Sequence, residues 1–216
     1  MRVDGVTLSE PSPDGVYVVA VGAAVYTVSV SDIAPAVAVR GFDPASALRP
    51  IRFVIGTDDA RERKGDWHAA TAAARRALAS ELIGNGKAML EIAVEQVSQR
   101  NQFGRPIGAN QTPRHRLADA YVQLSAASEL VAIAWASGTP WDARVAKAYA
   151  GYAADTTTRA SLQVCGAMGL TSEHALGGYV KRSRTLDALH GRWQHGMRAI
   201  GEQLLASRTI PRGVRV

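Results

Sequence analysis

A chain of 216 residues with 47% apolar content is long and apolar enough to bury a core. Its single cysteine, Cys165, excludes an internal disulfide, and no Cys or His partner stands at ligand spacing, so we expect no metal site. We also expect no membrane span, because a run of about 18 uncharged apolar residues is missing. The start, MRVDGVTLSEPSPDG, lacks a basic region followed by an apolar one, which favours a cytoplasmic protein.

The formal net charge of +6 is concentrated in residues 181–216, where eight basic side chains face only Asp187 and Glu202. Nucleic-acid and membrane-surface sites usually add aromatic side chains for stacking or a wide apolar face. Here a solvated helix face, or a pocket for an anionic cofactor, is the preferred interpretation. We therefore expect no nucleic-acid partner.

Short β-rich runs occupy the first part of the chain. They are VYVVAV (16–21), VYTVSV (25–30), AVAVR (36–40) and IRFVI (51–55), separated by glycine, proline and aspartate. The alternation of apolar and polar residues is imperfect and predicts one small sheet with open edges. Residues 1–60 are therefore predicted to form a small, incomplete β-domain.

From residue 61 the composition changes to alanine-rich helix. Trp67 to Gln99 carries apolar residues near helical spacing and predicts one long helix, whose stripe includes Leu78, Leu82, Ile83, Met89, Leu90, Ala93, Val94 and Val97. Gly84 and Gly86 each cost about 1 kcal/mol relative to alanine inside a helix. They indicate close packing against a neighbouring backbone.

Three more helices are predicted. The second begins at Thr112-Pro113, a cap and a first-turn proline, and runs to about residue 137. Its inward residues are predicted to be Leu117, Tyr121, Leu124, Val131 and Trp135. The third begins at Thr139-Pro140 and breaks at Gly166, and the fourth spans roughly 181–208. The pattern predicts a mainly α protein, with an antiparallel four-helix bundle over residues 61–216.

Two motifs lie at the ends of the predicted helices. The first is RNQFGRPIGANQ, residues 100–111, and the second is QVCGAMGLTSEH, which starts at Gln163. Together they resemble the C-terminal helical domain of acyl-CoA dehydrogenases. In that family the first helix ends in Arg-x-Gln-Phe-Gly-x-Pro-Ile, and the third ends in Gln-x-x-Gly-Gly-x-Gly-(aromatic)-(Thr/Ser)-x-Glu. The resemblance covers about residues 75–208, and the β-segment is similar to the tail of the family's middle domain.

The resemblance implies that FAD, shared across a subunit interface, is bound by Arg100, Gln102, Phe103, Ile107, Asn110, Gln163, Gly166, Ala167 and Gln194. The residue types of the linker suit FAD, because a pyrophosphate and a flat flavin need a fixed guanidinium, an apolar ring and amides. Ala167 replaces a glycine usual in the family. Without a cofactor, Gly104 would be a helix C-cap, Phe103 a core residue and Arg100 a solvated charge.

The family's catalytic base is a glutamate, and its two usual positions correspond to His190 and Ala74 here. We therefore expect no catalytic residue in this chain. Arg75 matches a position near the acyl-CoA substrate, although Ala72 replaces an aspartate usual there. A histidine can act as a base in principle, with an ordinary pKa near 6.5. The family's chemistry relies instead on an anionic base, and neither Glu81 nor Asp187 stands at a family position.

Three hypotheses follow. The favoured one is a base-less subunit that forms an oligomer with a full-length acyl-CoA dehydrogenase. Family members acting on steroid or other bulky acyl-CoAs in actinobacteria include such heteromers. The second is a self-sufficient dehydrogenase with an unrecognised base. The third is a helical scaffold or binding module that has lost flavin and activity.

Overall fold

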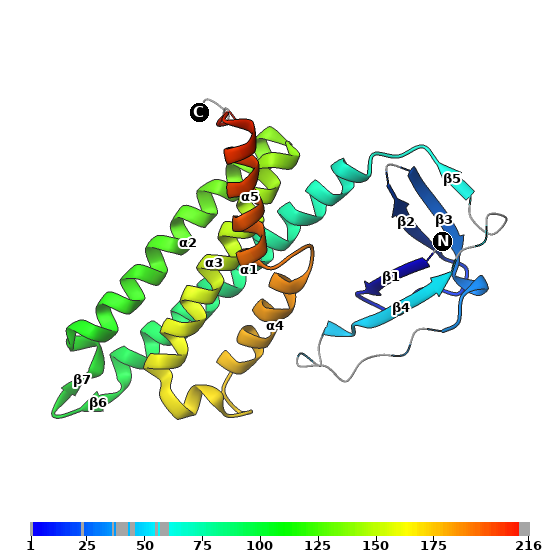
Figure 1. Ribbon diagram of the computed structural model, residues 1–216. Helices are drawn as coiled ribbons and strands as arrows, with labels where there is room; N and C mark the ends of the chain where they lie inside the picture. Colours follow the sequence, from blue (N-terminus) through cyan, green and yellow to red (C-terminus); the bar gives the residue numbers. More distant parts are fainter. Residues whose placement is uncertain are drawn as a thin grey trace. The chain divides into compact units, whose positions relative to one another are not determined.

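A computed structural model describes residues 2–22, 24–35, 37, 43, 46–54, 56 and 61–211 (Figure 1). The chain forms two compact units, Met1–Ala70 and Thr71–Val216. The sequence placed the boundary between residues 60 and 61, so the first unit is slightly longer than expected. It includes a short strand at 61–63 and the first residues of the first helix.

Among its described residues, the first unit has five strands in two antiparallel sheets. They are β1 (Arg2–Thr7), β2 (Val16–Val21), β3 (Ala24–Ser29), β4 (Arg49–Val54) and β5 (Arg61–Arg63). One sheet pairs β1 with β4, and the other has the order β2-β3-β5. Tyr17, Val28 and Ile51 come from both sheets and share one core, in which the Tyr17 and Phe53 rings lie 5.8 Å apart. The single sheet expected from the sequence is therefore two small ones.

The strands predicted near 16–21, 25–30 and 51–55 are present as β2, β3 and β4. The prediction missed β1, where Asp4 and Gly5 interrupt the apolar pattern, and β5, which is only the charged segment Arg61–Arg63. Both strands are held by partners distant in sequence, so local composition does not reveal them. Of the strand predicted at 36–40, residues 36 and 38–40 lie outside the described residues.

The second unit is helical, and its elements are α1 (Trp67–Gln99), α2 (Gln111–Ser137), α3 (Pro140–Cys165), α4 (Leu176–Ala188) and α5 (Trp193–Ser207). Local signals explain several helix ends. The Thr139 hydroxyl accepts a hydrogen bond from the Asp142 amide at 3.1 Å, beside a proline in the first turn of α3. Gly138, with φ of 66°, ends α2 in the left-handed conformation. The mainly α bundle preceded by a small β-unit is confirmed.

One boundary prediction in the bundle is wrong. The fourth helix, expected as one segment over 181–208, begins earlier and is divided into α4 and α5 by residues 189–192. His190 and Gly191 have φ of 52° and 95° in this break. Figure 1 shows that α4 and α5 run in the same direction, opposite to α3, so they share the fourth position of the antiparallel bundle.

The bundle core contains many alanines, which let the helices approach closely. One cluster includes Leu82, Leu124 and Leu186 with the small residues of α3, and a second includes Met89, Val97, Leu117, Val164 and Leu176. The second cluster joins the end of α1, the start of α2, the end of α3 and the start of α4. Those four helix ends therefore lie at one end of the bundle.

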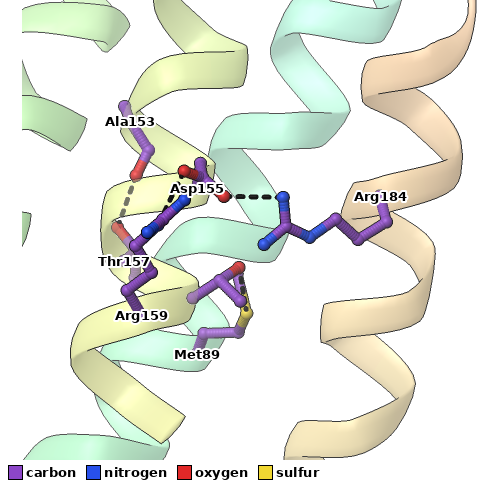
Figure 2. Close-up of polar contacts among 7 residues, drawn as sticks. Met89, Ala153, Asp155, Thr157, Arg159 and Arg184 are labelled. Carbon is purple, nitrogen blue, oxygen red and sulfur yellow. Dashed lines mark hydrogen bonds and ion pairs between the residues drawn. The ribbon is translucent and has the colours of Figure 1, made fainter. Parts of the chain in front are cut away.

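Ion pairs attach α4 to its neighbours. Asp155 of α3 is buried and contacts the guanidinium groups of Arg159, at 2.9 Å, and Arg184 of α4, at 2.6 Å (Figure 2). Arg182 of α4 pairs with Glu81 of α1 at 2.6 Å. Two of the basic residues interpreted as a solvated face or an anion pocket are thus structural contacts.

Several apolar side chains predicted to be internal are exposed. Tyr121 is 64% exposed, Trp135 is 54% exposed and Val94 is 47% exposed, whereas Leu117, Leu124 and Val131 are buried as expected. By length and composition alone, α2 is apolar enough to cross a membrane. Its buried residues pack into the two core clusters, as in a core helix of a bundle.

The two glycines of α1 have different environments, which gives a matched pair of substitutions. A methyl group at Gly86 would overlap the Leu124 side chain, while the space around Gly84 is open. We expect Gly84→Ala to raise the free energy of unfolding by about 0.5–1 kcal/mol through helix propensity. Gly86→Ala should lower it by about 1 kcal/mol, because Leu124 must move in a packed core. Urea denaturation measures both, and equal effects would contradict the packing seen at Gly86.

Candidate functional site

The linker between α1 and α2 is a tight β-hairpin. Its strands are β6 (Asn101–Gln102) and β7 (Arg105–Pro106), and the two turn residues are Phe103 and Gly104, with φ of 55° and 79°. Positive φ at both central residues is the geometry of a type I′ turn, which normally carries Asn-Gly or Gly-Gly. The Ile107 amide donates to the Arg100 carbonyl at 2.9 Å and closes the base of the hairpin.

Phe103 occupies an unfavourable position in two respects. The left-handed conformation costs a residue with a side chain about 1–2 kcal/mol. The side chain is also 99% exposed at the tip of the hairpin, where an aromatic ring gains nothing from its own chain. The alternative interpretation of Phe103 as a core residue, and of Gly104 as a helix C-cap, is therefore wrong. Strain of this kind at an exposed aromatic points to a contact outside the chain.

The polar side chains of the hairpin divide into two kinds. Arg100 and Gln102 are exposed, and their side chains make no hydrogen bond or ion pair with any described residue. Asn110 is engaged, since its Oδ1 accepts from Arg105 at 2.7 Å, and Ile107 packs against the core. The predicted cofactor residues Arg100, Gln102 and Phe103 are thus free to bind, while Ile107 and Asn110 also hold the linker in shape.

The second motif lies at the same end of the bundle. Gln163 and Ala167 are exposed near the end of α3, and Gly166 has φ of 61° and ψ of −147°, a conformation that suits glycine. Val97 and Val164 share the second core cluster, and Ile107 packs against it, so that cluster connects both motifs. Both predicted cofactor segments therefore present exposed polar and apolar groups at one end of the bundle.

His190 lies in the break between α4 and α5, which Lys147 and Asp187 hold in place. Lys147 of α3 is buried, and its Nζ donates to the carbonyl oxygens of Asp187, at 3.1 Å, and Gly191, at 3.3 Å. Its Nζ is also 3.7 Å from the Asp187 carboxylate. Asp187 Oδ1 in turn accepts from the Trp193 amide at 3.1 Å, at the start of α5. These contacts fix the backbone on both sides of His190.

A close approach of three elements makes this arrangement possible. A side chain at Gly151 would overlap the Asp187 carboxylate and lie 2.8 Å from Trp193 Cβ. The Trp193 ring packs edge-on against Tyr152, with centroids 5.3 Å apart. Gly151 therefore lets the break lie directly on α3.

Positive charge surrounds His190. Partial burial lowers the pKa of His190, and the charges of Arg75 and Lys147 lower it further. Burial also lowers the pKa of the Arg75 guanidinium, with a smaller contribution from the charge of Arg144. Arg75 makes no hydrogen bond or ion pair with a described residue. The sequence interpretation missed Arg144 and Lys147, although their i, i+3 spacing places both on one face of α3.

The carboxylates of Glu81 and Asp187, which do not stand at family positions, are both engaged in contacts within the bundle. Glu81 is paired with Arg182, and Asp187 is held by Lys147 and Trp193. Burial raises the pKa of Asp187, against the opposing effect of Lys147. Ala74, at the other position of the family glutamate, has no titratable group. In residues 61–211 and the described strands, no group of three or more His, Cys, Asp or Glu is placed to hold a metal ion.

The two groups of predicted residues are far apart within the chain. Lys147, beside His190, and Gln163, beside the linker, are 16 residues apart in α3. At 1.5 Å per residue this corresponds to about 24 Å along the helix. Gln194 is exposed in the first turn of α5, four residues after His190, and so belongs to the group around His190. The predicted residues therefore fall into two separate groups within the bundle.

Comparison with known proteins identifies the family. The family model described as acyl-CoA dehydrogenase, C-terminal domain, matches residues 68–205. The chain belongs to the acyl-CoA dehydrogenase family. Members of this family are in general FAD-dependent. The resemblance inferred from the two motifs is confirmed.

Individual relatives match different shares of this chain. The acyl-CoA dehydrogenase IpdE2 of Mycobacterium tuberculosis is 41% identical over 106 residues, which are 49% of this chain and 33% of the relative. The ChsE4-ChsE5 complex of Mycobacterium tuberculosis matches with a TM-score of 0.79 at 19% identity, over 97% of this chain and 61% of that one. A glutaryl-coenzyme A dehydrogenase matches with a TM-score of 0.75 at 19% identity, over 89% and 53%. The match spans about a third of the IpdE2 sequence.

The charge around His190 predicts an altered titration. Its pKa should lie below the ordinary value of 6.5, because burial and the charges of Arg75 and Lys147 disfavour the imidazolium form. Arg75→Ala should raise the pKa, whereas Arg76→Ala should leave it unchanged, since Arg76 contacts Gly138 and Trp135 instead. NMR titration, with the His190 signal assigned through His190→Gln, tests this. A midpoint at or above 6.5, or one insensitive to Arg75, would contradict the cluster.

Proposed function

We propose that this chain is a subunit of a heteromeric acyl-CoA dehydrogenase. It supplies Arg100, Gln102 and Phe103 to FAD held mainly by a second polypeptide. The second polypeptide provides the catalytic carboxylate and most of the flavin-ring site. The reaction of the assembly is α,β-dehydrogenation of an acyl-CoA thioester, in which the α-proton goes to a base and a hydride passes to the flavin.

The conformation of Phe103 carries this proposal. Its positive φ costs about 1–2 kcal/mol and its exposed ring gains nothing from its own chain, which favours a contact between Phe103 and a partner. Beside it stand an unpaired guanidinium and an unpaired amide, which match a pyrophosphate and the polar edges of a nucleotide. The cofactor fits these residues chemically, and Gln163, Gly166 and Ala167 would extend its site from the end of α3. Gln194 would contact the flavin of a second, incomplete site.

The surroundings of His190 support the absence of a base in this chain. An effective base must gain a proton, and a group whose pKa is lowered gains one less readily. Protonation of His190 would add a positive charge beside Arg75 and Lys147. A glutamate at this position would be stabilised by the same charges. The site therefore suits an anion better than it suits a basic imidazole, and Arg75 is the residue proposed to lie near acyl-CoA.

The first unit is proposed to be the tail of the family's middle domain. Solved family members match this chain over 84–97% of its length, which includes strands as well as helices, at identities that establish the fold alone. The strands expected to wrap the flavin ring would then belong to the second polypeptide.

The experiment is co-expression with a full-length acyl-CoA dehydrogenase from the same organism. We expect a stable mixed complex with visible flavin absorbance, and dehydrogenase activity only in the mixture. Arg100→Ala should lower bound flavin at least about tenfold, as the loss of one charge-assisted contact of 1.5–3 kcal/mol predicts. Arg61→Ala, at an exposed arginine of β5 outside both groups of predicted residues, is the matched control and should retain flavin.

Phe103→Gly should reduce flavin binding without lowering the stability of the isolated chain. Glycine tolerates positive φ, so the isolated chain should keep its stability or gain up to about 1 kcal/mol, while the complex loses flavin. Full activity of the partner alone would contradict the proposal. A mixed complex without flavin, unchanged by Arg100→Ala, would favour the scaffold hypothesis, and turnover by the pure chain would establish a self-sufficient enzyme.

A further inference from the structure

A groove on the surface of the bundle lies between α1 and α2 and has no part in the site described above. Its cavity volume is about 640 Å³. Leu90 and Val94 of α1 and Tyr121 and Leu124 of α2 form its apolar floor. The stretches 87–95 and 121–129 each span eight residue steps, about 12 Å or two turns at 1.5 Å per residue.

The floor continues the hydrophobic core to the surface. Leu124 is a member of the first core cluster and Leu90 packs against it, while Val94 is 47% exposed and Tyr121 is 64% exposed. This explains why the sequence pattern predicted both exposed residues to be internal. Ser125 and Ser128 also line the groove, and their small side chains leave room beside the floor. The Ser128 hydroxyl already donates to the Leu124 carbonyl at 2.9 Å, so covering it leaves no donor unpaired.

The rim of the groove is acidic, in contrast to the net charge of +6 on the whole chain. Glu91, Glu95 and Glu129 line it, with Lys87 as the one cation among the lining residues. Glu91 and Glu129 form no hydrogen bond or ion pair with the described residues, and Glu95 accepts only from the Gln99 amide, at 3.0 Å. An apolar floor with unpaired carboxylates on its edges is complementary to an apolar surface with basic edges.

We propose that this groove binds an amphipathic helix of a different protein chain, with an apolar stripe flanked by lysine or arginine. The apolar stripe packs on the floor formed by Leu90, Val94, Tyr121 and Leu124, and the basic side chains pair with Glu91 and Glu129. A helix in a groove of two flanking helices is an established recognition mode. A second copy using the same face fits poorly, because its acidic rim would meet an identical acidic rim. The proposal does not depend on flavin binding.

Two designed peptides of about 18 residues test the groove, a length of roughly 27 Å as helix. One has a leucine stripe with lysine elsewhere, and the other has the same stripe with glutamate. Fluorescence anisotropy with the full chain should show at least about tenfold tighter binding of the Leu/Lys peptide. Binding should weaken as salt is raised, because salt screens the rim charges.

Variants locate the binding. Glu91→Lys combined with Glu129→Lys should lose the preference for the Leu/Lys peptide by at least tenfold, since the rim then repels it. Glu62→Lys combined with Glu202→Lys makes the same charge change at exposed positions elsewhere and should bind like the wild type. Circular dichroism confirms that each variant is folded.

Three results would overturn the proposal. They are equal affinity for both peptides, unchanged affinity in the rim variant, and a dimer of the chain alone that Tyr121→Asp dissociates, which would make a second copy the occupant. Failure here is distinguishable from failure of the proposed function, because the flavin test uses Arg100, which is not among the residues that line the groove.

Discussion

The buried ammonium of Lys147 attaches the break between α4 and α5 to α3 and so fixes the surroundings of His190. It is shared between the backbone carbonyls of Asp187 and Gly191 and the Asp187 carboxylate, so the break between α4 and α5 is attached to α3. A buried charge of this kind is tolerated only when it is fully paired, and removing one partner is strongly destabilising. The same contact determines where His190 lies and starts α5 through the Trp193 amide. The position of His190, which the resemblance aligns with the family glutamate, is thus fixed by these contacts.

At the opposite end of the bundle, the linker hairpin has no comparable support from its own chain. Arg100, Gln102 and Phe103 are exposed, and the backbone of Phe103 is strained. The two groups of predicted residues are about 24 Å apart along α3, given 1.5 Å per residue. In the proposed function, the linker end contributes to a cofactor site and the His190 end to a substrate site, and a second polypeptide completes both. The acidic groove between α1 and α2 is proposed as a separate surface for a protein partner.

Much of the fold could be predicted from local chemistry. Thr139-Pro140 marked the start of α3 because a cap and a first-turn proline act within one turn, and the end of α2 near residue 137 was also predicted. The division between α4 and α5 could not be predicted, since it depends on Lys147, about 40 residues away, and Gly191 was its one local signal. The strands β1 and β5 were missed for the same reason, because distant partners hold them.

The site was only partly predictable. The motif located the linker, but the exposure and positive φ of Phe103 arise from the hairpin geometry. Helical periodicity also assigned Tyr121 and Trp135 to the core, because a core face and a face awaiting a partner have the same spacing. Arg75 was identified by resemblance, whereas its charged neighbours Arg144 and Lys147 required the packing of α1 on α3.

The most direct test of the central claim is a structure of the mixed assembly with FAD bound, by crystallography or electron cryomicroscopy. We expect the Arg100 guanidinium to lie within about 3 Å of a pyrophosphate oxygen, at the distance of a charge-assisted hydrogen bond. The Phe103 ring should lie against the same nucleotide. We also expect this nucleotide to be held mainly by the other polypeptide. A linker that lies in bulk solvent in the complete assembly, away from every nucleotide and protein neighbour, would contradict the claim.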